Sequence, residues 1–314
     1  MIIFWIILAA ADTVGLCALL TAYICFRRVF YNSNKFKNVE EYSIPDGEIY
    51  EPYREDMISW IKQKRALPHT EVSVTSHDGL TLRGEYFEYA PGAPIELMFH
   101  GYRGNAERDL SGGVLRCRRL GHSTLLVDHR AAGKSEGHVT GFGILEARDC
   151  LCWIDFIIKN IDPNAKIILT GVSMGAATVT TVTGYDLPGN VVGVLADCGY
   201  TSTREIICKV VAEMKLPPRL LYPFIRLGAR LFGHFDTEFM PPIEAVKKAR
   251  VPIIFIHGDA DDFVPCHMSR RNYEACVSPK RLVIIKDGGH GLAYPADPDT
   301  YLTALHEFFD PLTQ

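Results

Sequence analysis

Residues 171–175 read G-V-S-M-G and place a serine, Ser173, between a short apolar run and a stretch of small residues. The apolar run at 166–170 is typical of a buried strand, and the small residues at 176–178 suit the start of a helix. A serine in a G-x-S-x-G turn between a strand and a helix stands clear of the backbone, because the flanking glycines relieve crowding in a strained turn. We therefore expect Ser173 to act as a nucleophile, and the alternative is an ordinary turn serine.

A histidine and three carboxylates in later loops are candidates to activate this serine. His290 lies in residues 287–291 (D-G-G-H-G), directly after an apolar run at 281–285. Imidazole exchanges protons near neutral pH, so we expect His290 to take the serine proton and return it to the leaving group. The loop after the run at 252–256 offers a carboxylate to orient the imidazole, and spacing does not distinguish among Asp259, Asp261 and Asp262.

A second glycine-rich loop, residues 99–105 (F-H-G-Y-R-G-N), follows a further apolar run. Backbone N–H groups in such a loop can bind the negative charge that develops on a carbonyl oxygen during nucleophilic attack. We expect the N–H groups of Tyr102 and Met174 to form this oxyanion hole, and a plain strand-to-helix turn is the alternative. His100 and His257 each open a His-Gly pair at a strand end, and we expect them to build turns.

Short apolar runs alternate with helical stretches along most of the chain. A hairpin with a D-G turn at 78–79 comes first, and six runs follow it, at 95–99, 124–127, 166–170, 191–196, 252–256 and 281–285. Nearly continuous apolar strands that alternate with helices are typical of a parallel sheet with helices on both faces. Residues 203–249 carry apolar helical stretches and prolines but no clear strand, so we expect a helical lid insertion there.

These segments together resemble the α/β-hydrolase family over residues 71–312. Residues 128–137 (D-H-R-A-A-G-K-S-E-G) are similar to the family stretch D-x-R-G-x-G-x-S, although Ala132 stands where glycine is common. Residues 196–202 (A-D-C-G-Y-T-S) look like those of membrane-anchored or cytoplasmic bacterial hydrolases of unassigned substrate. The resemblance implies the α/β-hydrolase fold, a mostly parallel twisted sheet, and hydrolytic chemistry. It implies no particular substrate, because the fold carries many reactions.

The resemblance also implies a choice among the three carboxylates. Residues 257–265 match the family pattern H-G-x-x-D-x-x-V-P with Asp261 as the acid, and the chain order Ser173, Asp261, His290 matches as well. We expect a serine hydrolase that acts on small-molecule carboxylic esters, including lipid acyl esters or thioesters, through an acyl-enzyme. The alternatives are a serine peptidase or amidase on the same fold and a non-catalytic, membrane-bound interaction protein.

Residues 2–26 form an apolar segment with a single charge, Asp12. As a helix at ~1.5 Å per residue, the segment would be about 38 Å long, enough to span a ~30 Å hydrocarbon core with some tilt. No basic residue precedes it, and four follow it: Arg27, Arg28, Lys35 and Lys37. The positive-inside rule then places the N-terminus outside the cell membrane and the catalytic domain in the cytoplasm. A signal peptide that is cleaved on secretion and a buried helix are the alternatives, although the basic n-region of a signal peptide is missing.

Composition and motif content exclude several kinds of partner, and the chain divides into three expected segments. The chain has 314 residues, a net charge of −4 and a pI of about 6.3. It therefore lacks the excess of basic residues that is usual in nucleic-acid-binding proteins. Metal-ligand spacings and nucleotide-binding loops do not occur in the sequence, so we expect no cofactor and no metal. Nine cysteines without a C-x-x-C pair need not form a disulfide framework. We expect a transmembrane anchor at 1–26, a juxtamembrane linker and first helix at 27–70, and a hydrolase domain at 71–314.

Overall fold

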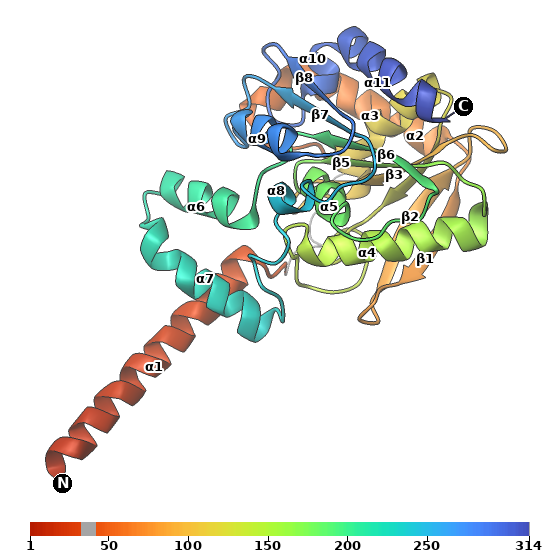
Figure 1. The fold of residues 1–314 in the computed structure, drawn as a ribbon. Coiled ribbons are helices and arrows are strands. Elements are labelled where there is room, and N and C mark those ends of the chain that lie inside the picture. Colours follow the sequence, from red (N-terminus) through yellow and green to blue (C-terminus); the bar gives the residue numbers. More distant parts are fainter. Residues whose placement is uncertain (33–41, 314) are drawn as a thin grey trace.

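A sheet of eight strands forms the centre of the protein, in a computed structural model that describes residues 1–32 and 42–313 (Figure 1). The strand order is β1-β2-β4-β3-β5-β6-β7-β8. β2 runs antiparallel to both β1 and β4, and the other neighbouring strands run parallel. The bounds are β1 Thr70–Thr75, β2 Thr81–Phe87, β3 Ile95–Phe99, β4 Ser123–Val127, β5 Ile167–Val172, β6 Val191–Asp197, β7 Ile253–Gly258 and β8 Lys280–Ile285.

The strands form where the sequence carries apolar runs, and the mostly parallel sheet is confirmed. All residues of β3 and β4 are buried, because helices cover both faces of the sheet. The hairpin of β1 and β2 turns at Asp78 and Gly79, where Gly79 has a φ of +90° that favours glycine. Parallel pairing brings the carboxyl ends of β3, β5, β6, β7 and β8 to one edge, where the loops with the expected site residues begin.

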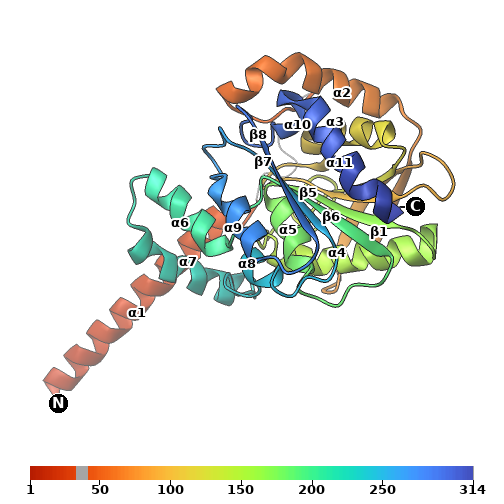
Figure 2. The same ribbon diagram turned by 45° about the horizontal axis from the view of Figure 1, so that its top comes forward.

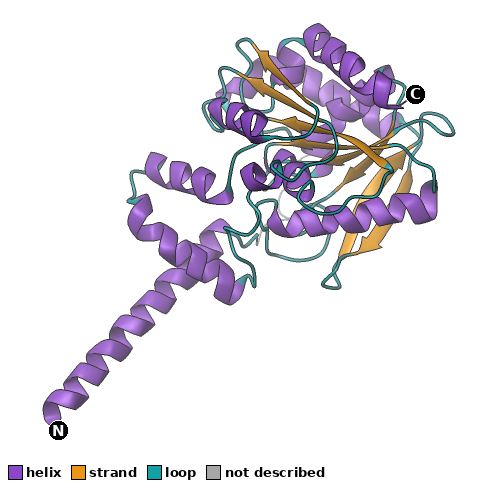
Figure 3. Ribbon diagram, in the orientation of Figure 1, coloured by secondary structure: helices purple, strands orange, loops and turns teal. Residues whose placement is uncertain are grey.

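Helices cover the two faces of the sheet (Figures 2 and 3). On one face, α4, α5 and α9 enclose a core that contains Trp153 and Val179. On the other face, α3 and α11 bury Leu110 and Leu305 in two smaller clusters. The bounds are α3 Ala106–Arg119, α4 Ile144–Phe156 with its π-helical extension η2 Ile157–Ile161, α5 Met174–Val182, α9 His267–Ala275, α10 Ala293–Ala296 and α11 Pro298–Thr313.

The stretch at 128–137, which follows β4, ties several elements together. The Asp128 carboxylate accepts hydrogen bonds from the first N–H of α3 at 2.9 Å and from the N–H of Lys134 at 2.8 Å. The buried Arg130 guanidinium pairs with Asp149 of α4 at 2.6 Å and with Asp78 of the hairpin turn at 2.9 Å. This stretch therefore connects α3, α4 and the turn of the β1–β2 hairpin.

The segment at 203–249 forms three helices, α6 (Thr203–Glu213), α7 (Pro218–Phe232) and α8 (Pro242–Ala245). The N-terminal helix α1 (Ile2–Val29) projects from the domain and crosses α7 near its own carboxyl end (Figure 1). Ala22, Phe26 and Phe30 of this region recur every four residues and are buried. By its length and apolar composition, α1 is able to cross a membrane.

Gly228 of α7 is the closest point of this helix crossing. A Cβ at this position would collide with the carbonyl oxygen of Ala22 and would lie 3.0 Å from the Cβ of Phe26. We expect Gly228→Val to destabilise the protein by about 1–3 kcal/mol, because the two helices cannot approach as closely. Thermal unfolding in detergent micelles measures this loss. Leu220→Val, at an exposed position of the same helix, is the control, and an equal effect of both substitutions would contradict the crossing.

Two helices lie between residue 47 and the first strand of the sheet. The 3₁₀ helix η1 (Glu48–Tyr53) leads into α2 (Arg54–Ala66), and α2 packs on α3 through Trp60, whose ring lies against Gly112. The buried Lys64 ammonium pairs with Glu85 and, at 3.3 Å, with Glu107. Lys35 and Lys37, which support the predicted membrane orientation, lie outside the described residues.

Candidate active site

Ser173 lies at the turn between β5 and α5, with φ of +57° and ψ of −114°. Positive φ is unusual for a residue other than glycine, so the turn is strained. A Cβ on Gly171 would collide with the carbonyl oxygen of Gly175, and a Cβ on Gly175 would collide with that of Phe99. Both glycines are therefore required for α5 to start this close to β3 and β5. The turn presents Ser173 at the carboxyl edge of the sheet, as the sequence pattern predicts.

His290 and Asp261 lie beside this serine. The Nε2 atom of His290 is 2.9 Å from the Ser173 Oγ, and its Nδ1 atom is 2.7 Å from the Asp261 Oδ2. A carboxylate only accepts hydrogen bonds, so Nδ1 carries the proton and Nε2 is free to accept from the serine hydroxyl. His290 follows β8 and Asp261 follows β7, and the parallel sheet brings both loops to the serine. The structure thus brings these three predicted residues together.

Of the three carboxylates after β7, Asp261 is the one that contacts His290. Its second oxygen, Oδ1, accepts two backbone N–H groups of its own loop, at 2.8 and 3.0 Å. Asp259 instead accepts a backbone N–H from the loop after β8 at 2.7 Å, and the side chain of Asp262 is exposed. The position implied by the family pattern is therefore the one that the geometry favours.

His257 is a second, buried partner of Asp261, whereas the sequence predicts for it only a place in a turn. Its Nε2 atom lies 3.1 Å from Asp261 Oδ2 and 2.8 Å from the carbonyl oxygen of Val264, and its Nδ1 atom lies 2.7 Å from the Ser269 hydroxyl. Burial raises the pKa of Asp261, but hydrogen bonds from His257 and His290 outweigh it and lower the pKa to about 2. His257 therefore helps to keep the Asp261 carboxylate ionised. Its position four residues before Asp261 is the feature of the sequence that could have indicated this role.

The lowered pKa of Asp261 predicts a pH-dependent contribution to stability. The carboxylate binds protons less readily in the folded than in the unfolded chain, so its contribution is present above about pH 4 and is lost as the pH falls toward about 2. We expect the destabilisation by Asp261→Asn to decrease by about 1 kcal/mol between pH 6 and pH 3. Urea unfolding across this range measures it, with Asp262→Asn as the control. A destabilisation that stays constant over the range would contradict the assignment.

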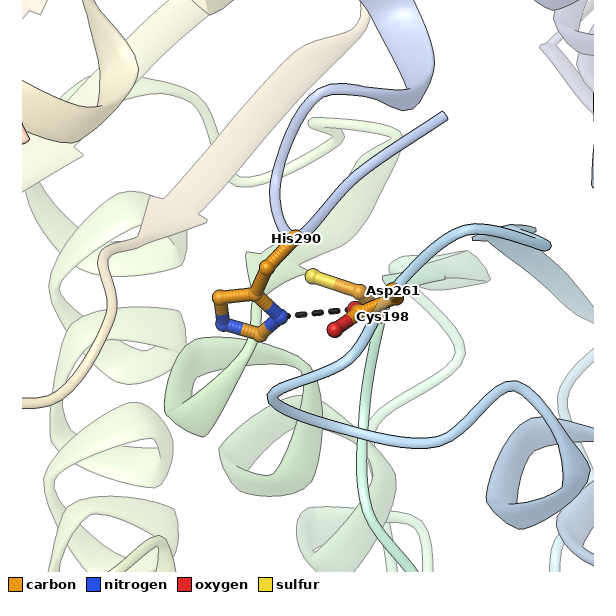
Figure 4. Close-up of side chains that lie close together, drawn as sticks. All are labelled: Cys198, Asp261 and His290. Carbon is orange, nitrogen blue, oxygen red and sulfur yellow. Dashed lines mark hydrogen bonds and ion pairs between the residues drawn. The ribbon is translucent and has the colours of Figure 1, made fainter. Parts of the chain in front are cut away.

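Cys198 follows β6 and lies close to Asp261 and His290 (Figure 4). One potential ligand atom from each of these three residues lies within 4.8 Å of the other two. Burial raises the pKa of the Cys198 thiol well above its usual value, and the charges of Asp197 and Asp261 add to the shift. A neutral thiol beside a histidine that already donates to Asp261 fits a packed side chain better than a metal ligand.

The two residues expected to form the oxyanion hole come from α5 and from the loop after β3. Met174 is the first residue of α5, and Tyr102 lies in the loop after β3 and lines the same cavity as Ser173. The Tyr102 hydroxyl donates to the carbonyl oxygen of Val29 at 2.6 Å, so its side chain connects this loop to the end of α1. Met174 thus adjoins the serine in the chain and Tyr102 shares its cavity, and the role of their N–H groups stays a prediction.

A cavity of about 490 Å³ opens beside Ser173 and His290. Residues of η1 and α2, and the three residues that precede η1, line part of its wall between positions 45 and 60. The Tyr50 hydroxyl donates to the carbonyl oxygen of His290 at 3.0 Å, so η1 also holds the loop that carries the histidine. Within the described part of the chain, the 203–249 helices contribute no residue to this wall, because their apolar side chains pack on α1 and on α5. The predicted lid therefore does not cover this cavity.

Known proteins are similar to the chain in sequence. No protein-family model matches it. The uncharacterized protein YqkD of Bacillus subtilis is 30% identical over 192 residues, which are 61% of this chain. The match spans 63% of the length of that relative, which is less than two thirds.

Solved structures are similar to the whole domain. An esterase of Pyrococcus furiosus has a TM-score of 0.64 at 21% identity, over 87% of this chain and 97% of the esterase chain. The Pyrococcus horikoshii acylaminoacyl peptidase has a TM-score of 0.57 at 17% identity, over 79% of this chain and 43% of the peptidase. With this sheet topology and these structural neighbours, the chain has the α/β-hydrolase fold. At this level of identity, the likeness shows the fold and leaves the reaction to be argued from the site.

Proposed function

We propose that the protein is a serine hydrolase that acts on carboxylic esters. The observation that carries this proposal is the hydrogen-bonded series from the Ser173 Oγ through His290 to Asp261. In this series the hydroxyl has a basic nitrogen to receive its proton, and the imidazole has an ionised carboxylate to stabilise its charged form. An esterase and a peptidase among the structural neighbours support hydrolysis as the class of reaction.

In the proposed reaction, the Ser173 oxygen attacks the ester carbonyl carbon while His290 Nε2 takes the hydroxyl proton. The N–H groups of Tyr102 and Met174 bind the oxyanion of the tetrahedral intermediate. The bond to the alcohol oxygen then breaks, and the alcohol leaves with the proton from His290. A water molecule, deprotonated by His290, attacks the acyl-enzyme and releases the carboxylic acid and the free serine.

The cavity supports an ester with a small acyl or alcohol group. Its volume of about 490 Å³ is in the usual range for small-molecule sites, and Met57, Trp60 and Leu110 contribute apolar wall. A serine peptidase is the second candidate, because the acylaminoacyl peptidase shares the fold. Side-by-side turnover of p-nitrophenyl butyrate and alanine p-nitroanilide distinguishes the two. We expect ester turnover that requires Ser173, whereas comparable anilide turnover would favour the peptidase.

We also propose that α1 holds the enzyme in a membrane. Ala22, Phe26 and Phe30 pack on the domain, which leaves residues 2–21 for lipid, a helix of about 30 Å that matches a bilayer core. The crossing helix α7 then lies near the membrane surface, where its exposed Leu220 and Leu231 would contact lipid. Cleavage of a signal peptide would remove buried aromatic side chains from this contact, which supports retention of the helix.

The proposed orientation places the domain in the cytoplasm, because Arg27 and Arg28 follow the apolar segment. Protease protection in bacterial membranes tests it, with a carboxyl-terminal epitope tag as the readout. We expect the tag to survive in spheroplasts and to be lost from inverted vesicles. Loss of the tag in spheroplasts would indicate the opposite orientation. A soluble tagged domain without α1 would indicate cleavage of a signal peptide.

A further inference from the structure

The cavity beside Ser173 has a buried polar end. Arg116 of α3, Thr170 of β5, Asp197 at the end of β6 and Tyr301 of α11 line it there, and each is at most 4% exposed. Charged groups are rarely buried this deeply without a full set of partners. The hydrogen bonds of these side chains therefore show whether the end is a closed part of the core or a place for a ligand.

Two polar atoms in this cluster lack partners among the described residues. Asp197 Oδ2 accepts from the Tyr301 hydroxyl at 2.8 Å, but no residue in the described chain donates to Asp197 Oδ1, which is also buried. The Arg116 guanidinium pairs with Glu96 through Nη2, yet its buried Nε atom has no acceptor among the described residues. A buried polar atom without a partner is unfavourable, because it has lost its hydrogen bond to water and gained none in the protein. A bound group that supplies both missing hydrogen bonds would recover that cost.

The neighbouring side chains cannot supply these bonds. The Thr170 hydroxyl donates to Glu96 at 2.8 Å, and His122 contacts the other oxygen of Glu96 at 2.9 Å. The Glu96 carboxylate is thus committed to three partners, including Arg116. What is missing at this end is one donor for Asp197 and one acceptor for Arg116.

We propose that this buried end binds a hydroxyl group of the substrate, which donates to Asp197 Oδ1 and accepts from Arg116 Nε. A hydroxyl is the smallest group that both donates and accepts. An ammonium group would be repelled by Arg116, and a carboxylate or phosphate group would be repelled by Asp197. The inference rests on the proposed hydrolase function and makes the substrate a hydroxyl-bearing ester.

A substrate hydroxyl bound at Asp197 would lie close to the carbonyl that Ser173 attacks. The N–H of Ser173 donates to the backbone carbonyl oxygen of Asp197 at 2.9 Å, and Val172 is the register partner of Asp197. The carboxylate-bearing residue is therefore a direct neighbour of the nucleophile in the sheet. A hydroxyl on a short acyl chain or on the alcohol portion of the ester can reach the Asp197 carboxylate.

The test compares kcat/KM for matched esters with and without a hydroxyl. The acyl arm uses p-nitrophenyl 3-hydroxybutyrate and p-nitrophenyl butyrate, and the alcohol arm uses glycerol monobutyrate and propyl butyrate. We expect the full-length wild-type protein to prefer the hydroxylated member of one arm by about 10–100-fold, because its analogue leaves two buried atoms unpaired. The arm that shows the preference identifies which portion of the ester carries the hydroxyl.

Variants separate the recognition of the hydroxyl from a general effect on folding. In Asp197→Leu/Tyr301→Phe both hydrogen-bonding partners become apolar, a change that is often nearly neutral for stability. We expect this double variant to lose the preference, whereas Tyr301→Phe, which keeps the carboxylate, retains it. Equal kcat/KM for the two esters within each arm, or a preference that survives in the double variant, would each overturn the inference. Absence of any Ser173-dependent ester turnover would instead reject the proposed function itself.

Discussion

Replacement of Ser173 by alanine is expected to lower kcat for p-nitrophenyl butyrate by about 10⁴–10⁶-fold, because the acyl-enzyme forms on the serine oxygen. The substitution removes one hydroxyl from a turn whose shape depends on Gly171 and Gly175. We therefore expect thermal unfolding to change little. Initial rates of the purified full-length protein in detergent measure the effect, with the same preparation checked by thermal unfolding.

The control for this variant is Ser59→Ala, which removes a hydroxyl from an exposed position of α2. We expect it to retain wild-type rates. If Ser173→Ala kept more than about 1% of the wild-type activity, the ester turnover would come from another group and the proposed nucleophile would be wrong.

Asp261→Asn is expected to lower kcat by about 10⁴-fold while KM changes much less. The carboxylate holds the proton of His290 on Nδ1, at 2.7 Å, and leaves Nε2 as the base for Ser173. An asparagine amide can donate to Nδ1, which favours the tautomer that has no lone pair on Nε2. The variant would therefore bind substrate and fail to deprotonate the serine. Steady-state kinetics over a range of pH measures both constants.

Two neighbouring carboxylates serve as matched controls for Asp261→Asn. Asp259 accepts a backbone N–H at 2.7 Å and Asp262 is exposed, so neither contacts the imidazole. We expect Asp259→Asn and Asp262→Asn to retain kcat within about three-fold, because neither carboxylate touches a reacting group. A loss in Asp262→Asn as large as that in Asp261→Asn would move the acid to the adjacent position.

The sheet, Ser173 and His290 could be predicted from the sequence for physical reasons, whereas only the family resemblance selects Asp261 among the three carboxylates. A strand buried on both faces must be apolar along its length, so runs such as 95–99 and 191–196 are visible without any contact information. The turn at 171–175 requires glycine at two positions because α5 starts against β3 and β5. Parallel strands end at one edge, so Ser173 and the loops after β7 and β8 had to meet there.

The cover of the cavity could not be predicted in the same way. The residues at 203–249 have the pattern of helices, but their partner depends on which apolar surfaces meet in space. Phe26 and Phe30 of the N-terminal region fill the contact with these helices, and η1 and α2 line the cavity instead. The role of Asp197 also depends on a distant partner, since Tyr301 is 104 positions from Asp197 in the sequence.

Labelling with a fluorophosphonate probe tests the central claim most directly, because the probe forms a covalent bond with an activated serine. The full-length protein is incubated with the probe in detergent, and the modified peptide is identified by mass spectrometry. The account predicts one labelled residue, Ser173, with labelling lost in Ser173→Ala and strongly slowed in Asp261→Asn. A folded wild-type protein that is not labelled, or a Ser173→Ala variant that is labelled as fast as the wild type, would contradict the proposal of a serine hydrolase.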